Sequence, residues 1–73
     1  MKSNMNTAIG QWLARQREAK GYSQQYVADR LGVTRTAVHY WETGKRTIYA
    51  VTMMDYCKAI GADPNELIYD LTK

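Results

Sequence analysis

The chain has 73 residues, 45% of them hydrophobic and 23% charged, and it carries a net charge of +3. This length allows one domain with one modest core, and the composition excludes a disordered or fibrous protein. No apolar stretch is long enough to span a bilayer, the N-terminal residues lack the apolar segment of a secretory signal, and the single cysteine, Cys57, excludes an internal disulfide. We therefore expect a cytoplasmic domain that is held together by helix packing, without a bound metal or cofactor.

The charges are distributed unevenly along the chain. Residues 1–46 contain eight basic and three acidic side chains, whereas residues 47–73 contain two basic and four acidic ones. The N-terminal part is therefore suited to approach a polyanion. The alternative interpretation is that these charges form an ordinary solvated surface of mixed sign.

Glycines and capping residues divide the chain into short helical segments. Ser23, Thr34 and Asp63 stand where helix N-caps are needed, and Asp63 is followed by a proline at the first helical position. No stretch alternates as a strand, so the sequence predicts an all-α fold. We expect a flexible arm at 1–5 and one domain at 6–73, with helices at about 6–20, 24–31, 35–43, 50–60 and 64–71.

Each predicted helix has an apolar stripe at helical spacing. We expect the buried positions, in chain order, to be Ile9, Trp12 and Leu13, then Val27, Ala28 and Leu31, then Ala37, Val38 and Trp41, then Met53, Met54, Cys57 and Ile60, and last Leu67, Ile68 and Leu71. The second and third helices are joined by a short glycine-containing turn, which predicts a helix-turn-helix with Val33 closing the junction.

Segments spread over most of the chain resemble the Cro- and Xre-like phage-repressor helix-turn-helix family. They are REAKGYSQ at 17–24, VA at 27–28, GVT at 32–34, WETGKR at 41–46 and AIGADPNEL at 59–67. The resemblance covers about residues 8–68 and implies a compact five-helix bundle that binds DNA. Two positions depart from the family pattern: Ile48 stands where a proline is frequent, and Tyr26 stands where an acidic residue is common.

The outward side of the predicted third helix suits the major groove of DNA. Its residues offer hydrogen-bond donors, acceptors, methyl groups and one cation, with no carboxylate at the centre. The resemblance implies that base edges are read by Arg35, Thr36, Tyr40 and His39. A solvated helix face is the alternative interpretation, although such faces usually carry Glu and Lys.

A second set of residues is expected to bind phosphates. Gln24 opens the second helix, where free N–H groups and the helix dipole favour an anion, and the resemblance gives it a phosphate contact. The basic pair after the third helix is placed for the same backbone, or alternatively complements that helix's C-terminal dipole. The predicted phosphate-binding residues are Gln24, Thr34, Thr43, Lys45 and Arg46.

The resemblance also implies a partly buried ion pair between Arg17 and Glu42, with a structural role. His39 is the only histidine and has no zinc-ligand spacing around it, so we expect no metal site. No arrangement of nucleophile, base and orienting group is present, so we expect no enzyme.

These features predict a sequence-specific regulator, a phage- or plasmid-type repressor, that binds double-stranded DNA on the nucleoid. Because one recognition helix reads few base pairs, we expect a homodimer on a pseudo-palindromic operator, with no small-molecule ligand. The candidate dimer surface is Leu67, Ile68, Tyr69 and Leu71, although Leu67 and Ile68 also fit intramolecular packing. Two other functions fit this sequence: the antitoxin of a toxin–antitoxin pair, and a protein-interaction module on the same scaffold.

Overall fold

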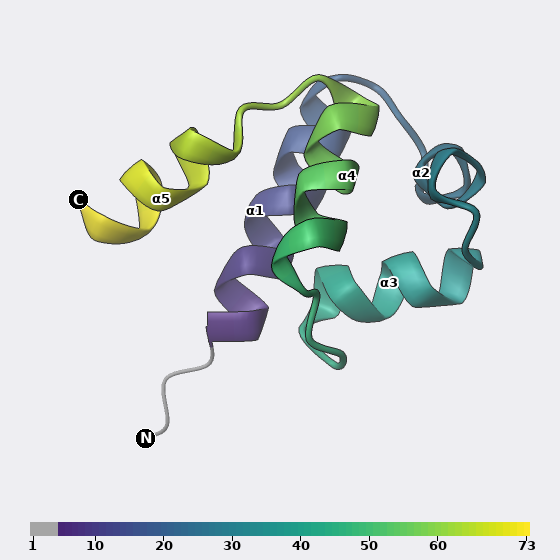
Figure 1. The fold of residues 1–73 in the computed structure, drawn as a ribbon, viewed down its shortest axis with the longest axis horizontal. Helices are drawn as coiled ribbons and strands as arrows, with labels where there is room; N and C mark the ends of the chain where they lie inside the picture. The colour runs from purple at the N-terminus through teal and green to yellow at the C-terminus, as the bar shows by residue number, and fades with distance from the viewer. Residues whose placement is uncertain (1–4) are drawn as a thin grey trace.

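The computed structural model describes residues 5–73, which form five helices and no strand (Figure 1). The helices are α1 (Met5–Ala19), α2 (Gln24–Leu31), α3 (Arg35–Thr43), α4 (Ala50–Ile60) and α5 (Pro64–Thr72). The predicted all-α fold is confirmed. Helix α1 begins at Met5, so this residue belongs to the helix and not to the predicted arm, whose residues 1–4 lie outside the described part.

The predicted capping residues start their helices as expected. The hydroxyl oxygens of Ser23 and Thr34 accept the backbone N–H groups of Tyr26 and Ala37, at 3.0 and 3.1 Å. The Asp63 carboxylate accepts the N–H of Asn65 at 2.9 Å. Each cap satisfies a donor that has no partner within the helix, so the helix boundaries follow from local sequence.

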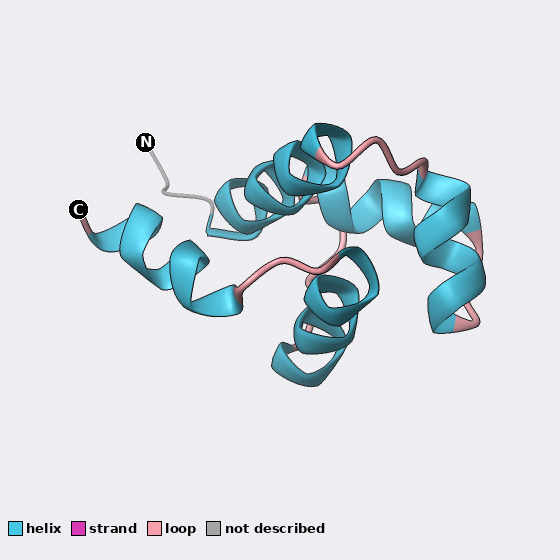
Figure 2. Ribbon diagram, turned by 90° about the horizontal axis from the view of Figure 1, so that it is seen from above, coloured by secondary structure: helices cyan, strands magenta, loops and turns pink. Residues whose placement is uncertain are grey.

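The helices are arranged around a central pair. Helices α1 and α4 run side by side, α2 and α3 lie at one end of the molecule, and α5 lies at the other end (Figures 1 and 2). The domain measures 34 × 22 × 21 Å along its principal axes. No helix within residues 5–73 is both long enough and apolar enough to cross a bilayer.

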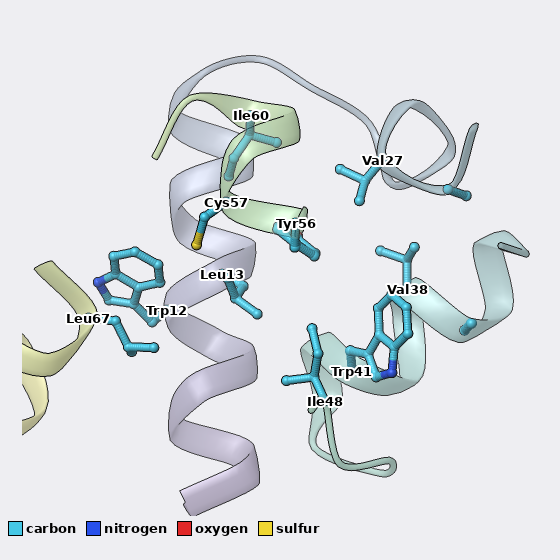
Figure 3. Close-up of a cluster of buried hydrophobic side chains, with 12 residues drawn as sticks. Trp12, Leu13, Val27, Val38, Trp41, Ile48, Tyr56, Cys57, Ile60 and Leu67 are labelled. Atoms are coloured by element: carbon cyan, nitrogen blue, oxygen red, sulfur yellow. The ribbon is translucent and has the colours of Figure 1, made fainter. Parts of the chain in front are cut away.

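One continuous core joins these elements (Figure 3). Its largest fully buried side chains are Trp12, Leu13, Val27, Val38, Tyr56 and Cys57. Ile48, in the loop after α3, is also buried. An apolar residue at this position therefore anchors the loop to the core, where the family often has a proline.

Helix α1 approaches the end of α3 so closely that only glycine fits between them. A Cβ atom on Gly10 would lie 2.7 Å from the carbonyl oxygen of Glu42 and closer still to that of Trp41. Gly44, which ends α3 with a φ of +80°, faces Thr7 at similarly short range. The two glycines thus fix the distance between α1 and α3.

The predicted stripe of α4 is wrong at one position. Met54 is 57% exposed, and Met53 is only partly buried, whereas Tyr56 is fully buried. The inward stripe therefore consists of Met53, Tyr56, Cys57 and Ile60, which share one face at spacings of three and four residues. Met54 lies beside this stripe, about 100° around the helix from Met53.

The predicted stripe of α5 is also wrong, because only Leu67 is buried. Ile68 is 61% and Leu71 39% exposed. Helix α5 contacts both α1 and α4, and the indole N–H of Trp12 donates to Asp70 Oδ2 at 2.9 Å. A charged residue, which the pattern assigned to the solvent side, thus helps to attach α5 to α1.

Candidate nucleic-acid interface

Helices α2 and α3 form the predicted helix-turn-helix. In Figure 1, α2 is seen end-on while α3 runs across the view, so the two helices cross steeply. Gly32 ends α2 in the left-handed conformation, and the N–H of Val33 donates to the Ala28 carbonyl oxygen at 3.0 Å. Val27 and Val38 are fully buried at the junction, which fixes α3 relative to the rest of the domain.

Helix α3 has one buried side and one exposed side. Its buried residues are Ala37, Val38, Trp41 and Glu42. On the other side, Arg35, Thr36, His39 and Thr43 are exposed, and Tyr40 is half-buried. The predicted base-reading residues therefore lie together on the outward side of the helix.

Two threonines at the ends of α3 also bond to its backbone. Thr34 caps the N-terminus through Ala37, and the Thr43 hydroxyl donates to the carbonyl oxygen of His39 at 3.0 Å. The Thr34 hydroxyl keeps its proton and can still donate it to a phosphate oxygen. Thr43 donates its only hydroxyl proton to the helix backbone, so it can accept from a water as it stands and can donate to a phosphate only after its hydroxyl rotates away from His39.

The loop after α3 presents its two cations next to Tyr40. Lys45 Nζ lies 5.7 Å, and the Arg46 guanidinium carbon 5.3 Å, from the centroid of the Tyr40 ring. The N–H of Arg46 donates to the Tyr40 carbonyl oxygen at 3.2 Å. Both basic residues are exposed, and within residues 5–73 neither is in an ion pair.

A buried polar network holds α3 to the other helices. Arg17 on α1 donates to Glu42 through Nε at 2.7 Å and through Nη2 at 3.0 Å, and its Nη1 donates to the Tyr22 carbonyl oxygen at 2.7 Å. The Tyr56 hydroxyl of α4 also donates to the Glu42 carboxylate. The two residues that the resemblance pairs are therefore in contact, and the described part of the chain leaves no buried side-chain polar atom without a partner.

The network keeps Glu42 charged despite its burial. Burial acts to raise the pKa of Glu42, but hydrogen bonds from Arg17, Tyr56 and Gln24 outweigh it and hold the pKa below its ordinary value. Burial and the adjacent carboxylate together raise the pKa of Tyr56, so its hydroxyl remains a donor. Tyr56 is not among the residues predicted for this network. The helical spacing of Tyr56 with Cys57 and Ile60 indicates that it is buried, but not that it contacts Glu42.

Gln24 is engaged within the protein. Its side chain is half-buried, and its Nε2 donates to Glu42 Oε1 at 2.9 Å. The residue still opens α2, where backbone N–H groups are free to face an anion. Gln24 therefore links the start of α2 to α3, and the amide group that is expected to bind phosphate donates to Glu42 in this structure.

The outer side of α2 carries an aromatic stack. The rings of Tyr22 and Tyr26 lie 4.2 Å apart at 7°, and the Arg30 guanidinium lies 5.7 Å from the Tyr26 ring. Tyr26, which replaces a common acidic residue, thus packs onto its neighbours.

Of the candidate dimer surface, only three residues are available at the surface. Ile68, Tyr69 and Leu71 are exposed, whereas Leu67 is 3% exposed and packs into the core. The predicted surface is therefore wrong at Leu67, because this side chain packs into the core and attaches α5 to its own domain.

Other reactive residues have no arrangement for metal binding. Within residues 5–73, no three His, Cys, Asp or Glu side chains gather as metal ligands would. Burial raises the pKa of Cys57 to about 11, so its thiol is protonated and packs as a small apolar group.

Comparisons with known proteins agree with this architecture. A helix-turn-helix family model, HTH_3, matches residues 13–67. The restriction-modification controller protein C.AhdI from Aeromonas hydrophila is similar in structure, with a TM-score of 0.81 and 32% identity over 89% of this chain and 98% of that one. A search of curated proteins gives no significant match.

Two further solved structures share the fold at lower identity. The clp gene regulator ClgR from C. glutamicum has a TM-score of 0.87 and 20% identity, covering 93% of this chain and 88% of its own. The controller protein C.Esp1396I has a TM-score of 0.82 and 18% identity, covering 99% of this chain and 100% of its own.

The chain belongs to the helix-turn-helix family of Xre- and Cro-like repressors. It is a DNA-binding transcription regulator, and its family and fold are not those of enzymes.

Proposed function

We propose that the protein is a repressor that binds a pseudo-palindromic operator as a homodimer, with α3 in the major groove. The observation that carries this proposal is the outward side of α3, where Arg35, Thr36 and His39 are exposed on a helix whose other side is fixed in the core. An α-helix fits the major groove, and these side chains match the chemistry displayed there.

We assign base reading and phosphate binding to different parts of this surface. Arg35 has the geometry for guanine O6 and N7, the Thr36 methyl group suits thymine, and Tyr40 and His39 lie one turn further along. Lys45 and Arg46, together with Thr34, Thr43 and the start of α2 at Gln24, would hold the DNA backbone. Phosphate contacts would supply most of the affinity, and base contacts the sequence preference.

The homodimer is proposed on α5. Ile68, Tyr69 and Leu71 are exposed on this helix, which lies at the opposite end of the molecule from α2 (Figure 1). Two copies joined at α5 would carry their α3 helices away from the shared contact, as binding to two half-sites of one operator requires.

The comparisons support this kind of regulator. C.AhdI, at 32% identity, is a controller protein of restriction and modification, and a variant of C.Esp1396I has been solved bound to its operator site. Control of transcription at an operator is the role that these likenesses favour for the present chain.

Selection of bound duplexes from a random DNA pool tests the proposal directly. The expected result is a symmetric consensus whose half-sites lie about one turn apart. Binding to the selected duplex should weaken by orders of magnitude between about 50 and 200 mM salt. No enrichment and a flat salt response would instead favour a protein-interaction module. An asymmetric consensus would contradict the dimer while leaving DNA binding in place.

A further inference from the structure

We infer that Tyr40 has a positioning role in DNA binding: its ring orders Lys45 and Arg46, the two cations of the loop that joins α3 to α4. This inference rests on the proposed binding of DNA by α3 and that loop. It adds to any contact that the Tyr40 hydroxyl makes with a base, because it concerns the face of the ring.

The loop is folded back onto residue 40 by both backbone and side chains. Gly44 ends α3 with a φ of +80°, which reverses the chain. The N–H of Arg46 then donates to the Tyr40 carbonyl oxygen at 3.2 Å. The two cationic side chains return over the ring of the same residue, at 5.7 Å for Lys45 and 5.3 Å for Arg46.

An aromatic ring can order a cation without neutralising it. The electron-rich face of tyrosine attracts Lys and Arg, and both distances lie within the range of this interaction. A carboxylate would also hold them, but it would compete with phosphate for their charge. In the described part of the chain no acidic side chain pairs with either residue. Tyr40 therefore leaves the full charge of both side chains available to DNA.

Ordering of this kind affects binding because long basic side chains lose much rotamer freedom when they meet a phosphate. A side chain that is already confined near its bound position loses less. The benefit does not depend on the base sequence, since phosphates are alike in every duplex. The expected signature is therefore a change in affinity that is equal for all sequences.

The first test needs no DNA. Ring currents shift the methylene protons of a side chain that lies over an aromatic face, so proton NMR should find such protons of Lys45 and Arg46 shifted upfield. Tyr40→Phe should keep these shifts, and Tyr40→Leu should lose them. Unshifted methylene protons in the unsubstituted protein would overturn the inference, whatever the protein does with DNA.

The second test measures affinity for the selected operator and for an unrelated duplex across a salt series. Tyr40→Leu should lose about three- to tenfold on both duplexes and keep its salt slope, because the same phosphates are still contacted. Tyr40→Phe should stay within about twofold on the unrelated duplex. Tyr49→Leu is the matched control, because Tyr49 is exposed at the end of the same loop and has no Lys or Arg of residues 5–73 over its ring.

The outcomes separate this inference from the function on which it rests. A loss in Tyr40→Leu that is confined to the operator would overturn the inference and leave Tyr40 as a base reader only. Equal losses in Tyr40→Leu and Tyr49→Leu would also overturn it. Failure of the unsubstituted protein to bind any duplex would contradict the proposed function, while the NMR shifts would still report on the ring and its cations.

Discussion

Arg17 on α1 and Glu42 on α3 form an ion pair joined by two hydrogen bonds, with Nε and Oε2 2.7 Å apart. Their side chains are only 9% and 4% exposed. Removing the carboxylate leaves a buried guanidinium without its counter-charge. Glu42→Ala should therefore lower the free energy of unfolding by about 3–5 kcal/mol. In a domain of this size such a loss lowers Tm by more than about 10 °C, which circular dichroism will measure.

Glu18 provides the matched control for this prediction. Its carboxylate also lies near Arg17, at 3.6 Å, but its side chain is 67% exposed. An exposed ion pair is screened by water, so Glu18→Ala should cost less than about 1 kcal/mol. Equal changes in Tm for the two variants would show that burial does not strengthen the Arg17–Glu42 pair.

The same network makes stability depend on pH in the acid range. Burial opposes the charge of Glu42, but its hydrogen bonds hold its pKa below the ordinary value of 4.5. Its contribution is therefore fully present above the pKa of the unfolded chain and is lost as pH falls through the pKa of the folded one. In urea unfolding, the difference in free energy of unfolding between the unsubstituted protein and Glu42→Gln should decrease below about pH 4.5. A difference that stays constant down to about pH 2.5 would contradict this linkage.

The five helices and the turn between α2 and α3 could be predicted because their signals are local. Caps such as Ser23 and Asp63 act within a single turn of the chain, and helical spacing identified Val27 and Val38 as core residues. Tyr56 and Asp70 could not be placed in this way. Their partners, Glu42 and Trp12, are distant in sequence, so only the packing of helices shows that Tyr56 is buried against Glu42 and that the exposed Asp70 accepts a bond from Trp12.

The exposure of Met54 and Ile68 was missed for a related reason. A stripe of apolar residues indicates which side of a helix is buried, but not how wide the contact is. The contact of α5 with α1 and α4 covers Leu67 and leaves Ile68 and Leu71 exposed. The outward residues of α3 could be listed from sequence, but the position of Lys45 and Arg46 over Tyr40 depends on how the loop turns back after Gly44.

Gly10 should tolerate no larger residue although it lies within a helix. Alanine is the better helix former by about 1 kcal/mol, but its Cβ would overlap the backbone carbonyl groups of Trp41 and Glu42. We expect Gly10→Ala to lower Tm by several degrees, since α1 and α3 must move apart. Gln11→Ala, at the exposed neighbouring position, is the control and should leave Tm unchanged or slightly raised. A stabilised Gly10→Ala variant would contradict the close approach of the two helices.

Arg35 and Lys45 should affect DNA binding in different ways. Arg35→Ala should cost about 1–3 kcal/mol and relax the preference at one base pair, because it removes a contact with a base edge. Lys45→Ala should weaken all sequences alike and make the salt dependence shallower, because it removes a phosphate contact. Selection from a random pool, repeated with each variant, measures both effects. Equal and sequence-independent losses would mean that the reading surface is not the outward side of α3.

Helix α5 offers a test that separates folding from association. Leu67 is buried, so Leu67→Ala should destabilise the domain by about 2–5 kcal/mol. Ile68 is 61% exposed, so Ile68→Glu should keep the helical circular dichroism while it shifts the sedimentation coefficient from that of a dimer to that of a monomer. Operator binding should then weaken, because the two half-sites are bound independently. Asn65→Glu places the same charge at another exposed position of α5 and should remain a dimer. A dimer that survives Ile68→Glu would place the interface elsewhere, since a buried carboxylate without a partner is incompatible with an apolar contact.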